Sequence, residues 1–162
     1  GGEIGVDELK EPVSPGQRDL FAAQLEIATA YRRPVIVHAA KAFAALTEHE
    51  TALKKVKFSH HGFVKNRELL KFINKCGGYI GLGALFLKQE KAAEMWAMMP
   101  QDRILFETDA PYRIDESRYN EAVQENLRRL AEIAGEEPEA LAERLIKNAE
   151  DFLRTDNLQI NK

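Results

Sequence analysis

The sequence predicts an α/β fold in which a parallel sheet is connected by helical crossovers. Five short apolar runs alternate with longer amphipathic stretches along the 162 residues, and this alternation is typical of parallel α/β proteins. No internal repeat or low-complexity linker interrupts it. The composition, 44% hydrophobic and 30% charged, is ordinary for a globular protein with a sizeable core. We therefore predict one domain over residues 1–155, followed by a polar C-terminal tail at 156–162.

The first two elements carry clear local signals. Ile4 and Val6 mark a short strand. In the helix that follows, Ser14 is a suitable N-cap, Pro15 fits the first helical position, and Gln17 completes a capping box. The following residues recur at helical spacing: Leu20, Phe21, Gln24, Leu25, Ile27, Ala28 and Tyr31.

The later elements continue the alternation. Four further strands are predicted, at residues 34–38, 56–61, 79–82 and 103–109. Helices are predicted at residues 43–48, 66–76, 88–98, 120–134 and 138–153. Asn66 is a suitable cap for the helix that it begins, and Gly135 suits the position just past the end of the helix at 120–134.

Charge and cysteine content narrow the function classes only a little. The net charge of −3 neither requires a nucleic-acid partner nor excludes one. Lys54, Lys55 and Lys57 form a basic cluster, which we interpret as a solvated face rather than a track for DNA. No apolar run approaches the roughly 20 residues that span a bilayer, so no membrane partner is expected. The single cysteine, Cys76, cannot form an internal disulfide, which favours a reducing, cytoplasmic location. No protein partner is evident.

Four polar residues fall on different strand signals. They are Glu3, His38, His61 and Asp109, and the last three lie at or just past the carboxyl end of their strand. Since the carboxyl ends of parallel strands share one face, these side chains are expected to converge there. Two imidazoles and two carboxylates suit a divalent ion such as Zn²⁺, Mn²⁺ or Mg²⁺. Taken singly, each residue has a structural alternative, such as a hydrogen-bonded histidine, a solvated terminal glutamate or an Asx turn at Asp109.

Several segments, standing in one order along nearly the whole chain, are similar to the signatures of one family. They are Gly2-Glu3-Ile4-Gly5-Val6-Asp7, the helix with Gln17, Phe21, Gln24 and Leu25, Pro34-Val35-Ile36-Val37-His38, His61-Gly62-Phe63, Gly78-Tyr79-Ile80-Gly81, Phe106-Glu107-Thr108-Asp109-Ala110-Pro111-Tyr112, Asn120, and residues 148–153. They resemble the TatD deoxyribonuclease family of metal-dependent hydrolases. The first and sixth of these segments are highly specific.

The resemblance implies a (β/α)₈ TIM barrel, of which residues 1–155 would supply about strands 4 to 8. It implies a site for one or two divalent ions (Mg, Mn or Zn) held by Glu3, His38, His61 and Asp109. Glu3 resembles the carboxylate that bridges two metals, and Asp109 resembles the ligand that also takes a proton from the attacking water. The reaction implied is phosphodiester hydrolysis, typically of DNA from a 3′ end, with nucleic acid as the partner.

Two neighbours of the implied ligands need a separate interpretation. His60 and His61 are adjacent on a strand, so their side chains point to opposite faces. His61 fits the family's His-Gly-Phe element, and His60 is therefore expected to pack outward under a helix. Glu107 lies on the same side of its strand as Asp109. It could orient a metal ligand or pair with a nearby cation, and we favour the second interpretation.

The chain also departs from the family pattern. The family begins with a His-x-His pair, but the histidines here are His38, His49, His60 and His61. We expect the sequence to be a fragment, the alternative being a natural truncation that pairs its edges with another chain. Little or no hydrolase activity is expected from these 162 residues alone.

The loops expected around the substrate depart from the pattern too. Lys41 and Lys65 stand where the family has other residues, and each could hold a substrate phosphate as a point charge or be a solvated loop lysine. The substrate is therefore open. The alternatives are hydrolysis of a small phosphoester, lactone or amide, and an inactive truncated homologue.

Overall fold

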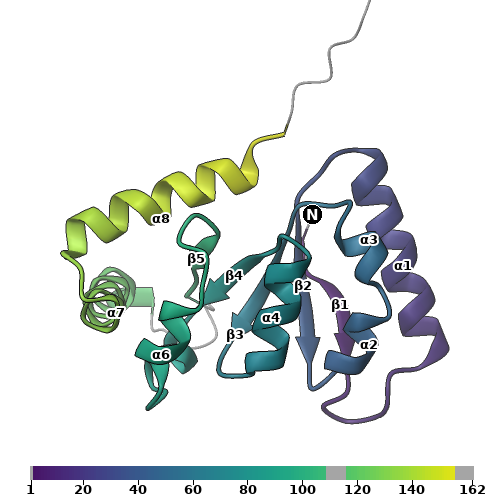
Figure 1. Ribbon diagram of the computed structural model, residues 1–162, viewed down its shortest axis with the longest axis horizontal. Helices are drawn as coiled ribbons and strands as arrows, with labels where there is room; N and C mark the ends of the chain where they lie inside the picture. The colour runs from purple at the N-terminus through teal and green to yellow at the C-terminus, as the bar shows by residue number, and fades with distance from the viewer. Residues whose placement is uncertain (1, 109–115, 156–162) are drawn as a thin grey trace, which may run out of the picture.

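A computed structural model describes residues 2–108 and 116–155, and this part contains one parallel sheet. Its five strands lie side by side in sequence order, each parallel to its neighbour. They are β1 (Ile4–Asp7), β2 (Val35–Ala40), β3 (Phe58–Phe63), β4 (Tyr79–Leu82) and β5 (Ile104–Phe106). Figure 1 shows the sheet as a twisted open array with β1 at one edge. The predicted parallel α/β fold and its five strands are confirmed.

Helices connect and follow these strands. They are α1 (Pro15–Ala30), α2 (Phe43–Thr47), α3 (Glu50–Leu53), α4 (Arg67–Lys75), α5 (Ala84–Leu87), α6 (Ala92–Ala97), α7 (Tyr119–Ala134) and α8 (Pro138–Leu153), with a 3₁₀ turn at Glu116–Arg118. The helix predicted at 88–98 begins only at Ala92, because a turn from Lys88 to Lys91 separates it from the short α5. None of the described helices is long and apolar enough to cross a membrane. Cys76 is free and buried at the end of α4.

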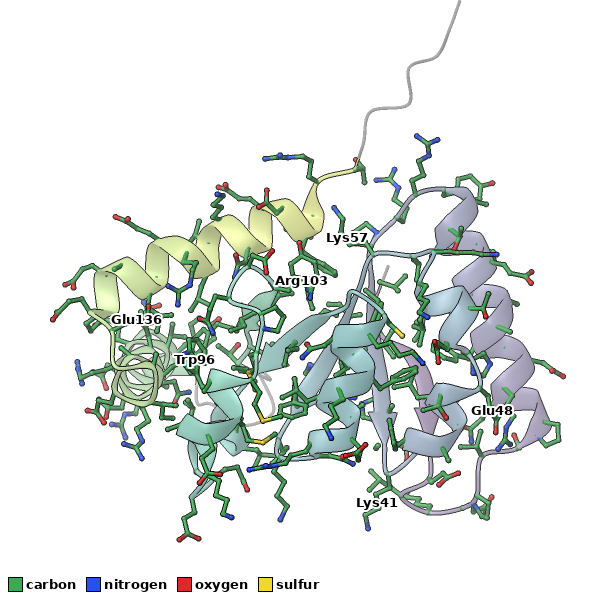
Figure 2. The ribbon with its side chains drawn as sticks, viewed as in Figure 1. Lys41, Glu48, Lys57, Trp96, Arg103 and Glu136 are labelled. Atoms are coloured by element: carbon green, nitrogen blue, oxygen red, sulfur yellow. The ribbon has the colours of Figure 1, made fainter. Side chains whose placement is uncertain are left out.

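Two lysines mark the two ends of the sheet. Lys57 immediately precedes β3 and marks the amino end, whereas Lys41 follows β2 and marks the carboxyl end. Figure 2 shows these two lysines at opposite ends of the strands. The carboxyl end is where the sequence predicts the polar site.

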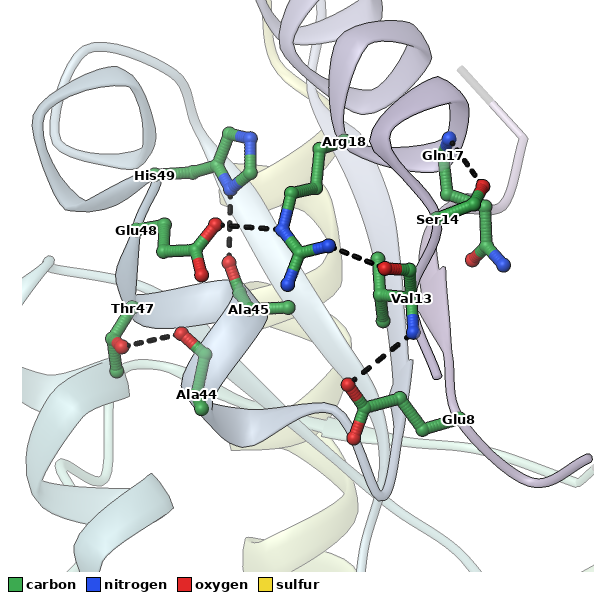
Figure 3. A network of polar contacts seen from close by, with 10 residues as sticks. All are labelled: Glu8, Val13, Ser14, Gln17, Arg18, Ala44, Ala45, Thr47, Glu48 and His49. Atoms are coloured by element: carbon green, nitrogen blue, oxygen red, sulfur yellow. Dashed lines mark hydrogen bonds and ion pairs between the residues drawn. The ribbon is translucent and has the colours of Figure 1, made fainter. Parts of the chain in front are cut away.

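Helix α1 begins as predicted but uses its first turn differently. Ser14 Oγ accepts a hydrogen bond from the backbone N–H of Gln17 at 3.2 Å (Figure 3). The Gln17 side chain does not close the expected capping box. Its Oε1 accepts instead from the N–H of Asp7 at 3.1 Å, which ties the helix to the end of β1.

Only one face of α1 is buried. Phe21, Leu25 and Ala28 lie in the core, whereas Leu20, Ile27 and Tyr31 have 59–71% of their surface exposed. Ile27 and Tyr31 line a hollow beside Ile4 on the edge strand β1. The apolar stripe of α1 is therefore wider than the surface that the described chain covers.

The two faces of the sheet are covered by different helices. Strand alternation places Val6, Val37, His60 and Ile80 on one face, where α1, α2 and α4 pack. The other face carries the residues between them. Helix α8 lies over this second face near the amino ends of the strands. There Phe152 contacts Tyr79, with ring centroids 5.1 Å apart.

Candidate metal centre

Two candidate ligands lie side by side on the second face of the sheet. Gly5 of β1 pairs in register with His38 of β2. The rings of His38 and His61, on neighbouring strands, have centroids 6.5 Å apart. Strand β2 continues to Ala40, so His38 lies within the strand rather than at its end as predicted. The sheet thus brings the two predicted histidine ligands together although they are 23 positions apart in the sequence.

Both ring nitrogens of His61 face carboxylates. Glu107 Oε2 lies 3.1 Å from His61 Nδ1, and Glu3 Oε1 lies 3.3 Å from His61 Nε2. The Glu107 side chain is largely covered and that of Glu3 is half exposed. A carboxylate on one imidazole nitrogen fixes the ring's orientation and leaves the other nitrogen available as a ligand. Within the described residues Glu107 therefore contacts a candidate metal ligand, which agrees with the orienting role that the sequence left open and not with the structural pairing to a cation that we favoured.

A bulge in β3 gives Glu107 its second contact. The register between β3 and β4 shifts between His60 and Phe63, and Gly62 adopts a left-handed conformation with φ of +67°. Its backbone N–H donates to Glu107 Oε2 at 2.9 Å. Bulges of this kind release a backbone group from the ladder and re-aim the neighbouring side chain. The local geometry of the His61-Gly62-Phe63 segment thus anchors the carboxylate that contacts His61.

Glu107 crosses strand β4 at a glycine. A Cβ atom added at Gly81 would lie only 2.0 Å from Glu107 Oε1. Glycine at this position is therefore what allows the carboxylate to reach from β5 over β4 to β3.

The Gly81→Ala variant should consequently be destabilised by about 1 kcal/mol or more, because overpacking forces Glu107 away from His61. Urea unfolding of four proteins tests this: the unaltered chain, Gly81→Ala, Glu107→Ala and the double variant. In the Glu107→Ala background, the alanine at position 81 should cost nothing. An equal cost in both backgrounds would show that the clash with Glu107 is not the cause.

His38 has an acidic neighbour that the sequence reading did not assign to the site. Asp7 Oδ2 lies 3.4 Å from His38 Nε2. The pKa of Asp7 is lowered, chiefly by the hydrogen bond that Oδ1 accepts from the Leu9 N–H at 2.7 Å, and also by His38. Glu3 immediately precedes β1, and Asp7 ends it four positions later. This even spacing was the available signal that both side chains lie on the same face.

His60 lies on the opposite face, as expected. Its side chain is buried, with 4% of the residue exposed, between Val37 and Ile80 in the register. Within the described residues neither ring nitrogen has a hydrogen-bond partner. Burial, and to a smaller extent the nearby His38 and His61, lower the pKa of His60 to about 4. His60 is thus a neutral core residue, and His61 is the histidine on the site face.

The other predicted site residues are only partly placed. Strand β5 ends at Phe106, earlier than the predicted 109, and Asp109 lies outside the described residues. Lys41 and Lys65 are exposed in the loops that follow β2 and β3. Within residues 2–108 and 116–155, no three His, Cys, Asp or Glu side chains are grouped closely enough to hold a metal ion.

The donor pairs that are present suit a divalent metal. Two ligands at about 2.1 Å from one tetrahedral ion lie about 3.4 Å apart. The separations of His61 from Glu3, 3.3 Å, and of His38 from Asp7, 3.4 Å, match that spacing. Imidazole and carboxylate are ligands that Zn²⁺ and Mn²⁺ accept. The chemistry of the site face therefore fits a metal.

Comparison with known proteins places the chain in a family. The family described as TatD related DNase matches residues 2–154. A 3'-5' ssDNA/RNA exonuclease TatD from Erwinia billingiae is 32% identical over 170 aligned positions, which cover 94% of this chain and 64% of the relative. A deoxyribonuclease Tat-D from Schizosaccharomyces pombe is 30% identical over 117 positions, 68% of this chain and 37% of the relative.

Solved structures agree on the fold. The crystal structure of YJJV, a TatD homologue from Escherichia coli k12, matches with a TM-score of 0.77 at 24% identity, over 94% of this chain and 62% of the other. A TatD family hydrolase from Entamoeba histolytica matches with a TM-score of 0.77 at 15% identity, over the same shares. The chain spans less than two thirds of the length of these relatives, so its five strands are part of a TatD-type barrel. Metal dependence is general to this type of fold. The chain belongs to the TatD-related DNase family.

Proposed function

We propose that this chain contributes to a metal-dependent hydrolase that cleaves phosphodiester bonds in nucleic acid, with DNA as the first candidate. The observation that carries the proposal is the placement of His61 between Glu107 and Glu3. It gives one imidazole an anchoring carboxylate on one side and a further metal-binding carboxylate on the other. Relatives named as exonucleases of single-stranded DNA and RNA support the same reaction class.

In this proposal Glu3, His38, His61 and Asp109 hold one or two divalent ions. A metal bound there supplies a Lewis acid for the attacking water and the phosphate oxygens. Glu107 holds His61 at Nδ1 and keeps Nε2 turned toward Glu3. Asp109 accepts the proton of the attacking water, an assignment that rests on its place in the Glu-Thr-Asp-Ala-Pro-Tyr segment.

Substrate contacts are proposed for the two loop lysines. Lys41 follows β2 and Lys65 follows β3 by two positions, and both are exposed. Their ammonium groups would attract the phosphates of a strand that approaches the carboxyl end of the sheet.

Titration calorimetry with Mn²⁺ and with Zn²⁺ tests the metal centre directly. The His61→Gln and Glu3→Gln variants are each expected to bind at least tenfold more weakly than the unaltered chain. His49→Gln is the matched control, because His49 lies between α2 and α3 and contacts Phe21 instead of the site. Binding that survives both site substitutions, or that His49→Gln weakens equally, would place the metal elsewhere.

Turnover assays then separate the substrate classes. Any hydrolysis of 3′-labelled single-stranded DNA should require the metal and disappear in Asp109→Asn. RNA and small phosphoesters, lactones and amides are assayed in parallel. Hydrolysis of a small ester or amide without cleavage of nucleic acid would contradict the nuclease assignment. Metal binding without any turnover would agree with the expectation that these 162 residues alone have little or no hydrolase activity.

A further inference from the structure

A hollow of about 260 Å³ at the amino end of the sheet is lined by cations from three separate segments. Arg32 and Arg33 come from the turn between α1 and β2, Lys55 and Lys57 from the turn between α3 and β3, and Arg154 from the end of α8. Five cationic residues therefore line one concavity, in a chain whose net charge is −3. The average composition does not account for this concentration of charge.

Residues that the structure describes neutralise little of this charge. Within the part of the chain that the structure describes, no carboxylate forms an ion pair with Arg32, Arg33 or Lys55. Arg154 pairs with Asp151 at 3.5 Å. Lys57 Nζ donates to the carbonyl oxygens of Asp151 and Arg154, at 2.7 and 2.9 Å. Those two bonds fix the ammonium group without adding a negative side chain.

Favourable interactions between cations and helix ends explain only some of the five cationic residues. Cations are favourable near a helix C-terminus, and Lys57 has that role at the end of α8. Arg32 is different, because it follows α1 in a left-handed conformation with φ of +50°. Helices α4 and α7 reach the same conformation with glycine, at Gly77 and Gly135. The backbone favours glycine at this position, yet at the rim of the hollow the sequence has an arginine.

We propose that this hollow is a binding site for phosphate groups, either those of a small phosphorylated ligand or those of a nucleic-acid strand. Arginine binds phosphate in a bidentate manner and lysine binds it as a point charge. The size suits phosphate or pyrophosphate, since pockets for larger ligands begin at about 300 Å³. The site lies at the opposite end of the strands from the proposed metal centre, as Lys57 and Lys41 show in Figure 2, and does not depend on it.

Calorimetric titration with pyrophosphate in EDTA tests the site without the metal. The double variant Arg33→Gln/Lys55→Gln should lose at least tenfold in affinity. Lys88→Gln/Lys91→Gln, which removes two exposed lysines elsewhere, should bind like the unaltered chain. The proposal would be overturned if the unaltered chain did not bind pyrophosphate at millimolar concentration. It would also be overturned if the first variant kept its affinity, or if the second lost as much affinity as the first.

A second titration identifies the source of the phosphate. Fluorescence anisotropy of a labelled oligo-dT is followed in EDTA over a range of salt concentrations. If a strand occupies the hollow, removing two cations should reduce the slope of log K against log salt by about 1.4, at about 0.7 for each phosphate contact. An unchanged slope with lost pyrophosphate binding identifies a small phosphorylated ligand. The substituted side chains are exposed, so the variants should fold normally, and an unchanged melting temperature checks this. Binding of Mn²⁺ at His61 should also be unchanged.

Discussion

Replacing His60 with leucine is expected to remove an acid-induced loss of stability of about 3 kcal/mol. His60 is buried on the helix-covered face of β3, and within the described residues neither of its ring nitrogens is hydrogen-bonded. Leucine is similar in volume and has no polar atom to desolvate. The variant should therefore be at least as stable as the unaltered chain at pH 8, because an unpaired buried polar group is destabilising by about 1–3 kcal/mol.

The direction of the pH effect follows from the lowered pKa of His60. Burial reduces that pKa from the ordinary 6.5 to about 4. Between these two values the unfolded chain binds a proton at His60 and the folded chain does not. The free energy of unfolding is therefore highest above about pH 6.5 and decreases as the pH falls toward 4. Below about pH 4 this residue causes no further decrease. The decrease of the pKa from 6.5 to about 4 corresponds to about 3 kcal/mol.

Urea unfolding of the metal-free protein at pH values from 4 to 8 measures the effect. The difference in unfolding free energy between His60→Leu and the unaltered chain should widen as the pH falls through this window. His49→Leu is the matched control, since it removes a partly exposed histidine and leaves His60 in place. A difference that stays constant with pH would mean that His60 takes up a proton as readily in the folded protein as in the unfolded chain.

The sheet was predictable from the sequence because its strand signals are local. The run at 34–38 and the helix at 138–153 carry their own apolar pattern and their own proline or cap signals. The short α3 and α5 were not predicted, because four-residue helices have too few turns to show a periodicity. The exposure of Ile27 and Tyr31 was equally unpredictable, since helical spacing reports a stripe but not what covers it.

The site shows the same division between local and long-range information. His38, His61 and Glu3 could be chosen from their strand positions, and alternation separated His61 from His60. The contact between Glu107 and His61 could not be predicted from the sequence, because it depends on the bulge at Gly62 and on the absence of a side chain at Gly81. Both are features of how β3, β4 and β5 align, and no single strand contains them.

Substitution of Glu107 is expected to weaken metal binding at His61 by 10- to 100-fold, although Glu107 is not itself proposed as a ligand. Loss of the group that orients a ligating histidine typically has an effect of about that size. Glu107→Gln keeps the shape and the hydrogen bond from Gly62 but removes the charge beside Nδ1, so it should lie near the tenfold end. Glu107→Ala also frees the ring to rotate and should lie near the hundredfold end.

Two readouts distinguish positioning of His61 from a general loss of stability. Calorimetry with Zn²⁺ gives the affinity, and the ¹⁵N spectrum of the metal-free imidazole gives the tautomer. In the unaltered chain a His61 proton should reside on Nδ1, facing Glu107 Oε2 at 3.1 Å. In Glu107→Ala the proton should shift toward Nε2, which faces Glu3 Oε1 at 3.3 Å. Glu90→Gln, an exposed substitution in the turn before α6, should change neither quantity. If Glu107→Ala lowers the melting temperature but leaves the tautomer and the Zn²⁺ affinity unchanged, Glu107 supports the sheet and does not position His61.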